Sequence, residues 1–171
     1  MLGGRGCEAS GQYSIAGGRN ATAPEDGQVV FTDSNGVNPN TTYSNRFHGR
    51  FDGGYRLETD VDNANTGVYM DKGDGSWSSL SDPETKTNIR SVDEKTVLDG
   101  VADLDISRWS YEWQTDIEHM GPMAGDLYEK FGVGRDDRGI QTIDAFGVLF
   151  AAVQGLAERV EQLEGTTTEE S

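Results

Sequence analysis

Two residues that could do chemistry together, Ser81 and Lys86, stand in the stretch SDPETKTNI at 81–89. A neutral lysine amine can take the proton of a serine hydroxyl, which leaves the serine oxygen as a nucleophile. Lysine does this near neutral pH only where desolvation or a neighbouring positive charge favours its uncharged form. Spacing alone does not establish such a dyad, because Ser-Asp-Pro also begins ordinary turns and helices.

The stretch lies where the composition and the secondary-structure signals of the chain change. Residues 1–80 hold most of the 23 glycines and show no sustained helical period, and short β-type segments recur between turns rich in Gly, Asn and Asp. These segments are 28–34, 55–61 and 67–71. Alternation in the second segment predicts one covered face, formed by Tyr55, Leu57, Thr59 and Val61. We therefore expect a β-rich first domain over residues 1–80.

Helical signals begin after residue 90. Ser91 followed by Glu94 has the spacing of a capping box, which predicts a helix over about 93–103. A second helix is predicted over 122–132, where a glycine ends it. Residues 106–113 alternate as a strand does. We expect burial of the strand side formed by Ser107, Trp109, Tyr111 and Trp113.

The strongest periodic signal is at the end of the chain. Large apolar residues recur there at alternating spacings of three and four, which is the a/d pattern of a coiled coil. They are Phe146, Leu149, Val153, Leu156, Val160 and Leu163. We predict a helix over 143–164 that pairs with other helices through this seam, followed by a frayed polar tail. An ordinary amphipathic helix within its own domain is the alternative.

Charge and composition limit the classes of partner. The chain has 14 Lys and Arg against 30 Asp and Glu, a net charge of -16. This surface repels phosphates and anionic lipids, so we expect no nucleic-acid partner. It also suits a halophilic source, where salt screens the repulsion. The hydrophobic fraction of 34% is low, so we expect the glycine-rich part to gain stability by pairing with other copies.

Other features of the sequence argue against several kinds of site. The single cysteine, Cys7, excludes an intrachain disulfide and a cysteine-based metal site, and we expect no metal and no cofactor. No apolar run approaches the roughly 20 residues that a membrane-spanning helix needs, and the first residues lack the apolar stretch of a signal peptide. We expect no membrane insertion.

Four ordered motifs carry a family resemblance over residues 81–164. They are SDPETKTNIR at 81–90, VLDGVADLDISRWSYEW at 97–113, HMGPMAGDLYEKFGVG at 119–134 and IQTIDAFGVLFAAVQGLAERVEQLE at 140–164. This segment resembles the intramolecular chaperone domain of phage tail fibres and tailspikes, peptidase family S74. The chain departs from the family pattern at Pro83 and Glu84, which replace a commonly basic pair.

The resemblance implies a domain that trimerises, guides three fibre chains into an interwoven β fold and then cuts itself off. By the same resemblance the scissile bond is Leu80–Ser81, with Ser81 as the nucleophile and Lys86 as the general base. An acyl shift onto the serine oxygen and direct hydrolysis both remain open. His119 matches the histidine of the family's His-x-Gly-Pro motif, which supports cleavage. A structural histidine beside the turn at Gly121 is the alternative.

Residues 11–34 are similar to the repeats of trimeric adhesin heads and fibre shafts, in which three chains wind together. The expected fold is α+β: an intertwined homotrimer with a β-rich fibre segment at 1–80 and a mixed α/β chaperone domain at 81–171 that ends in the coiled-coil helix. The expected function is that of a viral tail fibre that attaches to a host cell-surface receptor, a glycan being one candidate. We expect the protein in the virion, assembled in the host cytoplasm, with a cell-surface adhesin as the alternative. The alternative function is a structural trimerisation domain that does not cleave.

Overall fold

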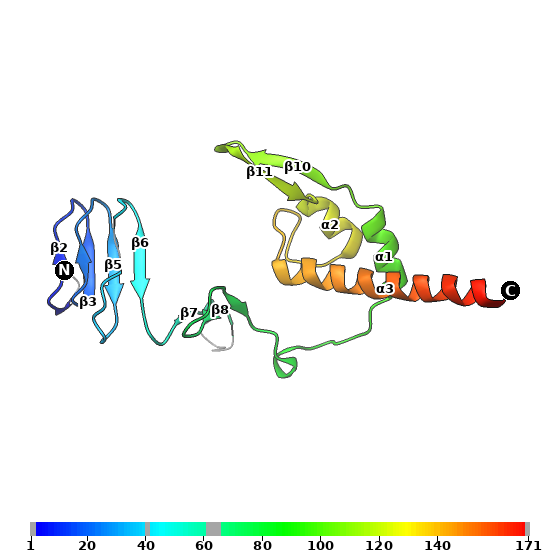
Figure 1. Cartoon of the computed structure of the whole chain (residues 1–171), viewed down its shortest axis with the longest axis horizontal. Coiled ribbons are helices and arrows are strands. Elements are labelled where there is room, and N and C mark those ends of the chain that lie inside the picture. Colours follow the sequence, from blue (N-terminus) through cyan, green and yellow to red (C-terminus); the bar gives the residue numbers. More distant parts are fainter. Residues whose placement is uncertain (1–2, 40–41, 61–65, 170–171) are drawn as a thin grey trace. The chain divides into compact units, whose positions relative to one another are not determined.

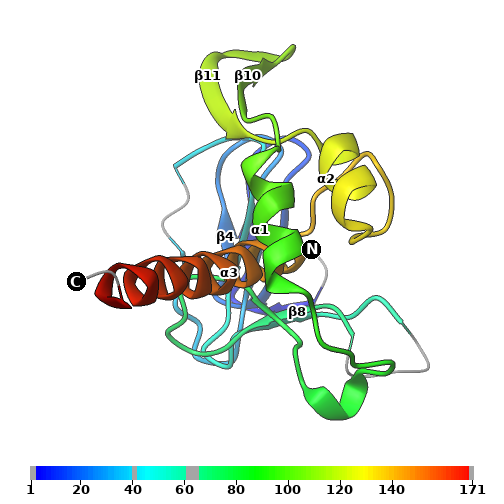
Figure 2. The same cartoon turned by 90° about the vertical axis from the view of Figure 1, so that its right-hand side faces the viewer.

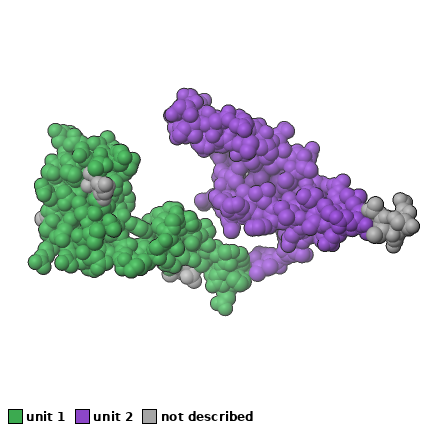
Figure 3. Space-filling view, in the orientation of Figure 1, with its two compact units in different colours: residues 1–86 green, residues 87–171 purple. Residues whose placement is uncertain are grey.

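The computed structural model describes residues 3–39, 42–60 and 66–169. It divides the chain into two compact units, residues 1–86 and residues 87–171 (Figure 3). The fold is mixed α/β, with three α-helices among the described residues and a long helix at the C-terminal end. The intertwined trimer and the coiled coil concern several chains and stay predictions, as does the domain boundary at 80/81.

Six short strands form the first part of unit 1, which we name the strand stack (Figure 1). They are β1 (Gly4–Arg5), β2 (Glu8–Ala9), β3 (Ile15–Arg19), β4 (Thr22–Ala23), β5 (Val29–Thr32) and β6 (Phe47–Arg50). All of their pairings are parallel, in the order β1-β3-β5-β6 and as the pair β2-β4. Ile15 lies beside Val29 and Glu8 beside Thr22, an offset of 14 residues that Gln12 and Asp26 repeat. The chain therefore coils on itself with a nearly regular period.

Small residues make this close coiling possible. Ala16, Ala21, Ala23 and Val30 are fully buried and form the core of the stack. At Gly18 the backbone has φ +101°, and a Cβ there would lie 1.9 Å from the carbonyl oxygen of Thr32. Only glycine fits such a position. The strands of this region pair within one chain and enclose a core of their own, and pairing with other copies stays a prediction.

A three-stranded antiparallel sheet follows in unit 1, made of β7 (Tyr55–Leu57), β8 (Val68–Met70) and β9 (Ser78–Ser79). Tyr55 is half-buried and its ring meets that of Trp77, with centroids 6.3 Å apart. The predicted covered face is wrong at Leu57, which is 57% exposed, and at Thr59, which is exposed. Strands of two and three residues give too little sheet to cover them. Val61 lies outside the described residues.

In unit 2 the first helix is α1 (Glu94–Ala102), close to the predicted 93–103. The predicted capping box is wrong, because Asp93 and not Ser91 is the N-cap. The Asp93 carboxylate accepts hydrogen bonds from the Thr96 amide at 3.2 Å and from the Thr96 hydroxyl at 2.8 Å. Aspartate caps a helix as well as serine does, and here it stands directly before the first helical residue.

The predicted strand at 106–113 is half of a hairpin, β10 (Ser107–Tyr111) and β11 (Gln114–Gly121). Figures 1 and 2 show the hairpin extending away from the helices of unit 2. The expectation that its aromatic side is buried is wrong, since Trp113 is 81% exposed and Ser107 and Tyr111 are exposed as well. A two-stranded hairpin has no second layer of its own to cover a face. Trp109 alone is half-buried.

The other two helices are α2 (Ala124–Phe131) and α3 (Thr142–Glu169). Gly132 ends α2 in the left-handed conformation with φ +63°, as predicted. Helix α3 continues beyond the predicted end at 164, because Gly165 does not take up the left-handed conformation that would stop it. Figures 1 and 2 show α1 lying across α3.

Candidate active site

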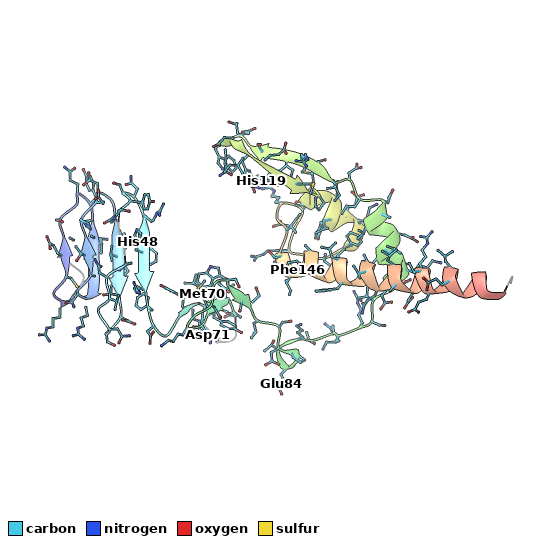
Figure 4. All side chains as sticks on the ribbon, in the orientation of Figure 1. His48, Met70, Asp71, Glu84, His119 and Phe146 are labelled. Carbon is cyan, nitrogen blue, oxygen red and sulfur yellow. The ribbon has the colours of Figure 1, made fainter. Side chains whose placement is uncertain are left out.

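A single turn of 3-10 helix brings the predicted dyad together. The turn, η1 (Pro83–Thr85), lies between extended residues on both sides. Its backbone bonds run from the Thr85 amide to the Asp82 carbonyl and from the Lys86 amide to the Pro83 carbonyl, each 3.1 Å long. Pro83 suits the start of such a turn because its ring fixes φ and it has no amide to leave unpaired. Glu84 marks the turn in Figure 4.

The Lys86 amine donates a hydrogen bond to the Ser81 hydroxyl, with Nζ and Oγ 2.8 Å apart. This is within the reach needed for proton transfer between a nucleophile and its base. The two side chains belong to the same unit, so the contact needs nothing beyond the local turn. The lysine amine is the donor in this bond, whereas base chemistry requires the reverse direction, in which a neutral amine accepts from the hydroxyl.

The dyad is open to solvent in the single chain. Every residue from 79 to 93 is exposed, and Leu80, whose carbonyl would be attacked, is 37% exposed. A lysine amine in water is protonated near neutral pH. The geometry of the pair is therefore ready, while the low-dielectric surroundings that favour a neutral amine are not supplied by this part of the chain.

His119 lies on β11 in unit 2, where it pairs with Trp109 across the hairpin (Figure 4). Its ring stacks on the Trp109 ring with centroids 4.7 Å apart and contacts the Tyr111 ring at 5.4 Å. The Nε2 atom of His119 and the Nε1 atom of Trp109 are both buried and have no hydrogen-bond partner among the described residues. A buried polar atom without a partner carries a desolvation cost.

The predicted coiled-coil residues, which we name the α3 seam, lie uncovered on α3. Their exposed fractions run from 44% at Val160 to 64% at Leu163. The full seam is Phe146, Leu149, Val153, Leu156, Val160 and Leu163. Val148, Ala151 and Ala152, which lie at other positions of the helix, are buried instead. A Cβ on Gly155 would lie 2.5 Å from the Glu94 carbonyl oxygen, so α1 packs closely there.

Charged groups around the helices of unit 2 are paired locally. Lys130 donates to the carboxylate of Asp103, and this bond lowers the pKa of Asp103 below its usual range. The hydrogen bond from the Thr96 side chain likewise lowers the pKa of Asp93. No group of three or more His, Cys, Asp or Glu side chains is placed to hold a metal ion in the described part of the chain.

One feature of the site was missed by sequence reasoning: the hydrogen bonds that hold the turn. The Asp82 carboxylate accepts from the Glu84 amide, and the Thr85 hydroxyl donates to the Asp82 carbonyl. The signal was present, because Asp directly before Pro, with Thr three residues after the Asp, is typical of a capped turn.

Comparison with known proteins gives the class of this site. Residues 81–132 match the family model Peptidase_S74, described as chaperone of endosialidase. The match begins at the serine of the dyad and runs through the hairpin to the end of α2. The resemblance inferred from the motifs is thus confirmed over residues 81–132, where the chain carries a chaperone segment of this family, and the terminal motif at 140–164 lies outside the match. No curated protein and no solved structure matches the chain. Among the described residues, no helix is both long and apolar enough to cross a bilayer.

Proposed function

We propose that this chain is a tail fibre protein whose C-terminal domain assembles three copies and then releases itself by cutting the Leu80–Ser81 bond. The observation that carries the proposal is the 2.8 Å contact between Ser81 Oγ and Lys86 Nζ at the first residues of the chaperone segment. In the proposed product, residues 1–80 remain as the fibre part and attach to a host cell-surface receptor. The site of action is the virion.

The chemistry follows from the position of the nucleophile beside its target. Ser81 Oγ attacks the carbonyl carbon of Leu80, and its proton passes to the neutral amine of Lys86. The C–N bond breaks, and Lys86 returns the proton to the nitrogen that becomes the new amino terminus. Water then hydrolyses the Leu80 ester, which restores the Ser81 hydroxyl and leaves a carboxylate on Leu80.

In this proposal assembly enables cutting because it removes solvent from around the dyad. The uncovered α3 seam has the a/d spacing through which helices of several copies pair. The dyad of one chain is exposed, and assembly would supply the desolvation that favours a neutral lysine amine. By the family resemblance His119, whose Nε2 has no partner among the described residues, also takes part in cutting. Cutting would then wait for a formed trimer.

The direct test is to express the chain and weigh the products by denaturing gel and mass spectrometry. We expect a fragment that begins at Ser81 in the wild type and an uncut 18.6 kDa chain in Ser81→Ala and Lys86→Ala. Hydroxylamine added during cutting should trap the Leu80 ester as a hydroxamate. A wild-type chain that forms trimers and stays intact at low and at high salt would sink the cleavage proposal.

The second candidate function is a trimerisation domain that stays attached. The exposure of Ser81 and Lys86 favours it, because a dyad that assembly does not cover lacks the desolvation that favours a neutral amine. Sizing distinguishes it from the first: intact trimers support a structural role, and a monomer would argue against both.

A further inference from the structure

We propose that Asp82 and Thr85 are positioning residues of the cutting site, which together hold Lys86 against Ser81; this inference rests on the proposed autoproteolysis. Both act on the turn between the two dyad residues, through bonds to its backbone and not through the dyad atoms themselves. We name their three hydrogen bonds the clasp.

The clasp consists of local bonds around Asp82. Its carboxylate Oδ1 accepts the Glu84 amide at 2.9 Å, which is the capping bond of the turn. Its carbonyl oxygen accepts two donors from Thr85, the amide at 3.1 Å and the hydroxyl at 2.8 Å. Asp82 and Thr85 are thereby joined through both main chain and side chain.

The turn depends on these bonds because it has little else. A 3-10 turn of three residues is marginal by itself, and none of its residues is buried. Asp82 (φ -70°, ψ 125°) and Lys86 (φ -104°, ψ 145°) are both extended, so the chain enters and leaves the turn without helical support. Whether the Lys86 side chain meets Ser81 is decided by how tightly the turn closes. Without the clasp the lysine amine would sample many positions away from the hydroxyl.

The clasp lies wholly within residues 82–85, so it can form before any copies assemble. The proposed reaction then has two separable requirements: the clasp sets the dyad geometry, and assembly supplies desolvation. Loss of the clasp should slow cutting and leave trimer formation untouched. Charge on Asp82 has no part in this role, since an amide oxygen can accept the Glu84 amide equally well.

The test compares cutting rates in the full chain, in pairs of variants. We expect Thr85→Val to cut about three- to tenfold more slowly, the effect of one side-chain hydrogen bond on a rate, and Asp82→Ala to cut at least as slowly. Thr85→Ser and Asp82→Asn, which restore the bonds, should cut within about twofold of wild type. The pH at half-maximal rate should not move in any of them. Thr87→Val, outside the turn, is the matched control.

Several results would overturn the clasp. One is a wild-type cutting rate for Thr85→Val, and another is a Thr85→Ser chain that cuts as slowly as Thr85→Val. An Asp82→Asn chain that cuts as slowly as Asp82→Ala would also overturn it, because the charge of Asp82 would then matter. If Ser81→Ala and Lys86→Ala stay uncut and both clasp losses cut at the wild-type rate, the clasp fails and the proposed function stands.

A second measurement tests the clasp without cutting. In the full Ser81→Ala chain, labelled selectively for NMR, we expect a nuclear Overhauser contact between the methyl group introduced at position 81 and the Lys86 ε-methylene. Adding Thr85→Val or Asp82→Ala should weaken it. Absence of the contact in Ser81→Ala, or its persistence at full strength in the double variants, refutes the clasp even if no chain is ever cut.

Discussion

The strand stack and helix α3 differ in which apolar side chains they bury. The stack encloses Ala16, Ala21, Ala23 and Val30 completely, using only strands of its own chain. Helix α3 buries Val148, Ala151 and Ala152 and leaves the larger residues of the α3 seam about half exposed. In the stack the small apolar residues are covered within the chain, although Phe47 of β6 is 64% exposed, whereas on α3 the large apolar residues of the seam stay exposed.

The α3 seam, and not the core of the strand stack, is therefore the surface that the proposed assembly would use. A seam of six large apolar residues on one helix is uncommon on the surface of a monomer, and its a/d spacing is self-complementary between helices. The strand stack has a repeating register and a core enclosed within one chain. This division fits a domain that assembles a fibre and is not needed once the fibre has formed.

The largest expected effect is the loss of the trimer when the α3 seam is charged. Leu156→Glu places one carboxylate per chain in the seam, and we expect trimer affinity to fall by at least about a hundredfold, because apolar burial is lost and like charges meet. Gln154→Glu adds the same charge outside the seam and should leave the trimer intact. Sedimentation of the uncut Ser81→Ala chain measures both.

An unchanged trimer in Leu156→Glu would contradict the proposed contrast between the two regions, because it would show that the α3 seam does not mediate assembly. Circular dichroism must show retained helix in the variant, which separates loss of assembly from loss of fold.

The converse substitution belongs to the strand stack. Val30→Asp puts an unpaired charge in a fully buried position, and we expect the stack to lose about 3 kcal/mol or more of stability while the trimer persists. Val37→Asp, at a position 48% exposed, is the control and should change stability little. Limited proteolysis mapped by mass spectrometry reports the stack directly. Loss of the trimer in Val30→Asp would show that the two regions are not independent.

A smaller effect is expected where α1 meets α3. Gly155→Ala would force its methyl group to within 2.5 Å of the Glu94 carbonyl oxygen, and we expect a loss of about 1–3 kcal/mol. Gly147→Ala on the same helix meets no atom within 4 Å and should stabilise α3 by about 0.5–1 kcal/mol. Thermal melting of the two variants should therefore shift in opposite directions. Equal shifts would mean that the close contact at Gly155 does not constrain the helices.

Sequence reasoning succeeded where the local pattern decides the structure. The helices α1 and α2, the strand near Trp109 and the long terminal helix were all predicted, because period and stop signals act within a few residues. The capping box failed for a local reason: Ser91 and Asp93 both stand near the helix start, and only the geometry shows which one caps it.

The predictions that failed concern burial. Trp113 and Leu57 have the alternation of covered strand residues but are exposed, because burial depends on a second layer that a strand pattern cannot reveal. The coiling of the strand stack within one chain was not predicted, because glycine-rich repeats suit pairing within a chain as well as between chains, and pairing between copies stays a prediction. At the site, the family resemblance predicted the pairing of Ser81 with Lys86, which their spacing alone did not establish, but the bonds of Asp82 and Thr85 that close the turn became visible only in the structure.

The smallest expected effect is a pH dependence that should be shared by both regions. The pKa of Asp33 in the stack is lowered first by the Asp52 amide, and that of Asp93 in unit 2 first by the Thr96 side chain. Both folded pKa values lie below the ordinary value of 3.8, so the carboxylates stabilise the fold above that pH and lose this contribution as the pH falls toward the folded values.

We expect the melting temperature of the Ser81→Ala chain to fall as the pH is lowered below about 4. Asp93→Asn keeps an acceptor at the N-cap and removes the titrating group, so its melting curve for unit 2 should depend less on pH than that of the parent. Asp33→Asn should do the same for the strand stack only. The effects are small because both groups are exposed to solvent. Parallel curves for parent and variants would show that these caps do not link protonation to folding, and a shift in the wrong region would show that the two regions unfold together.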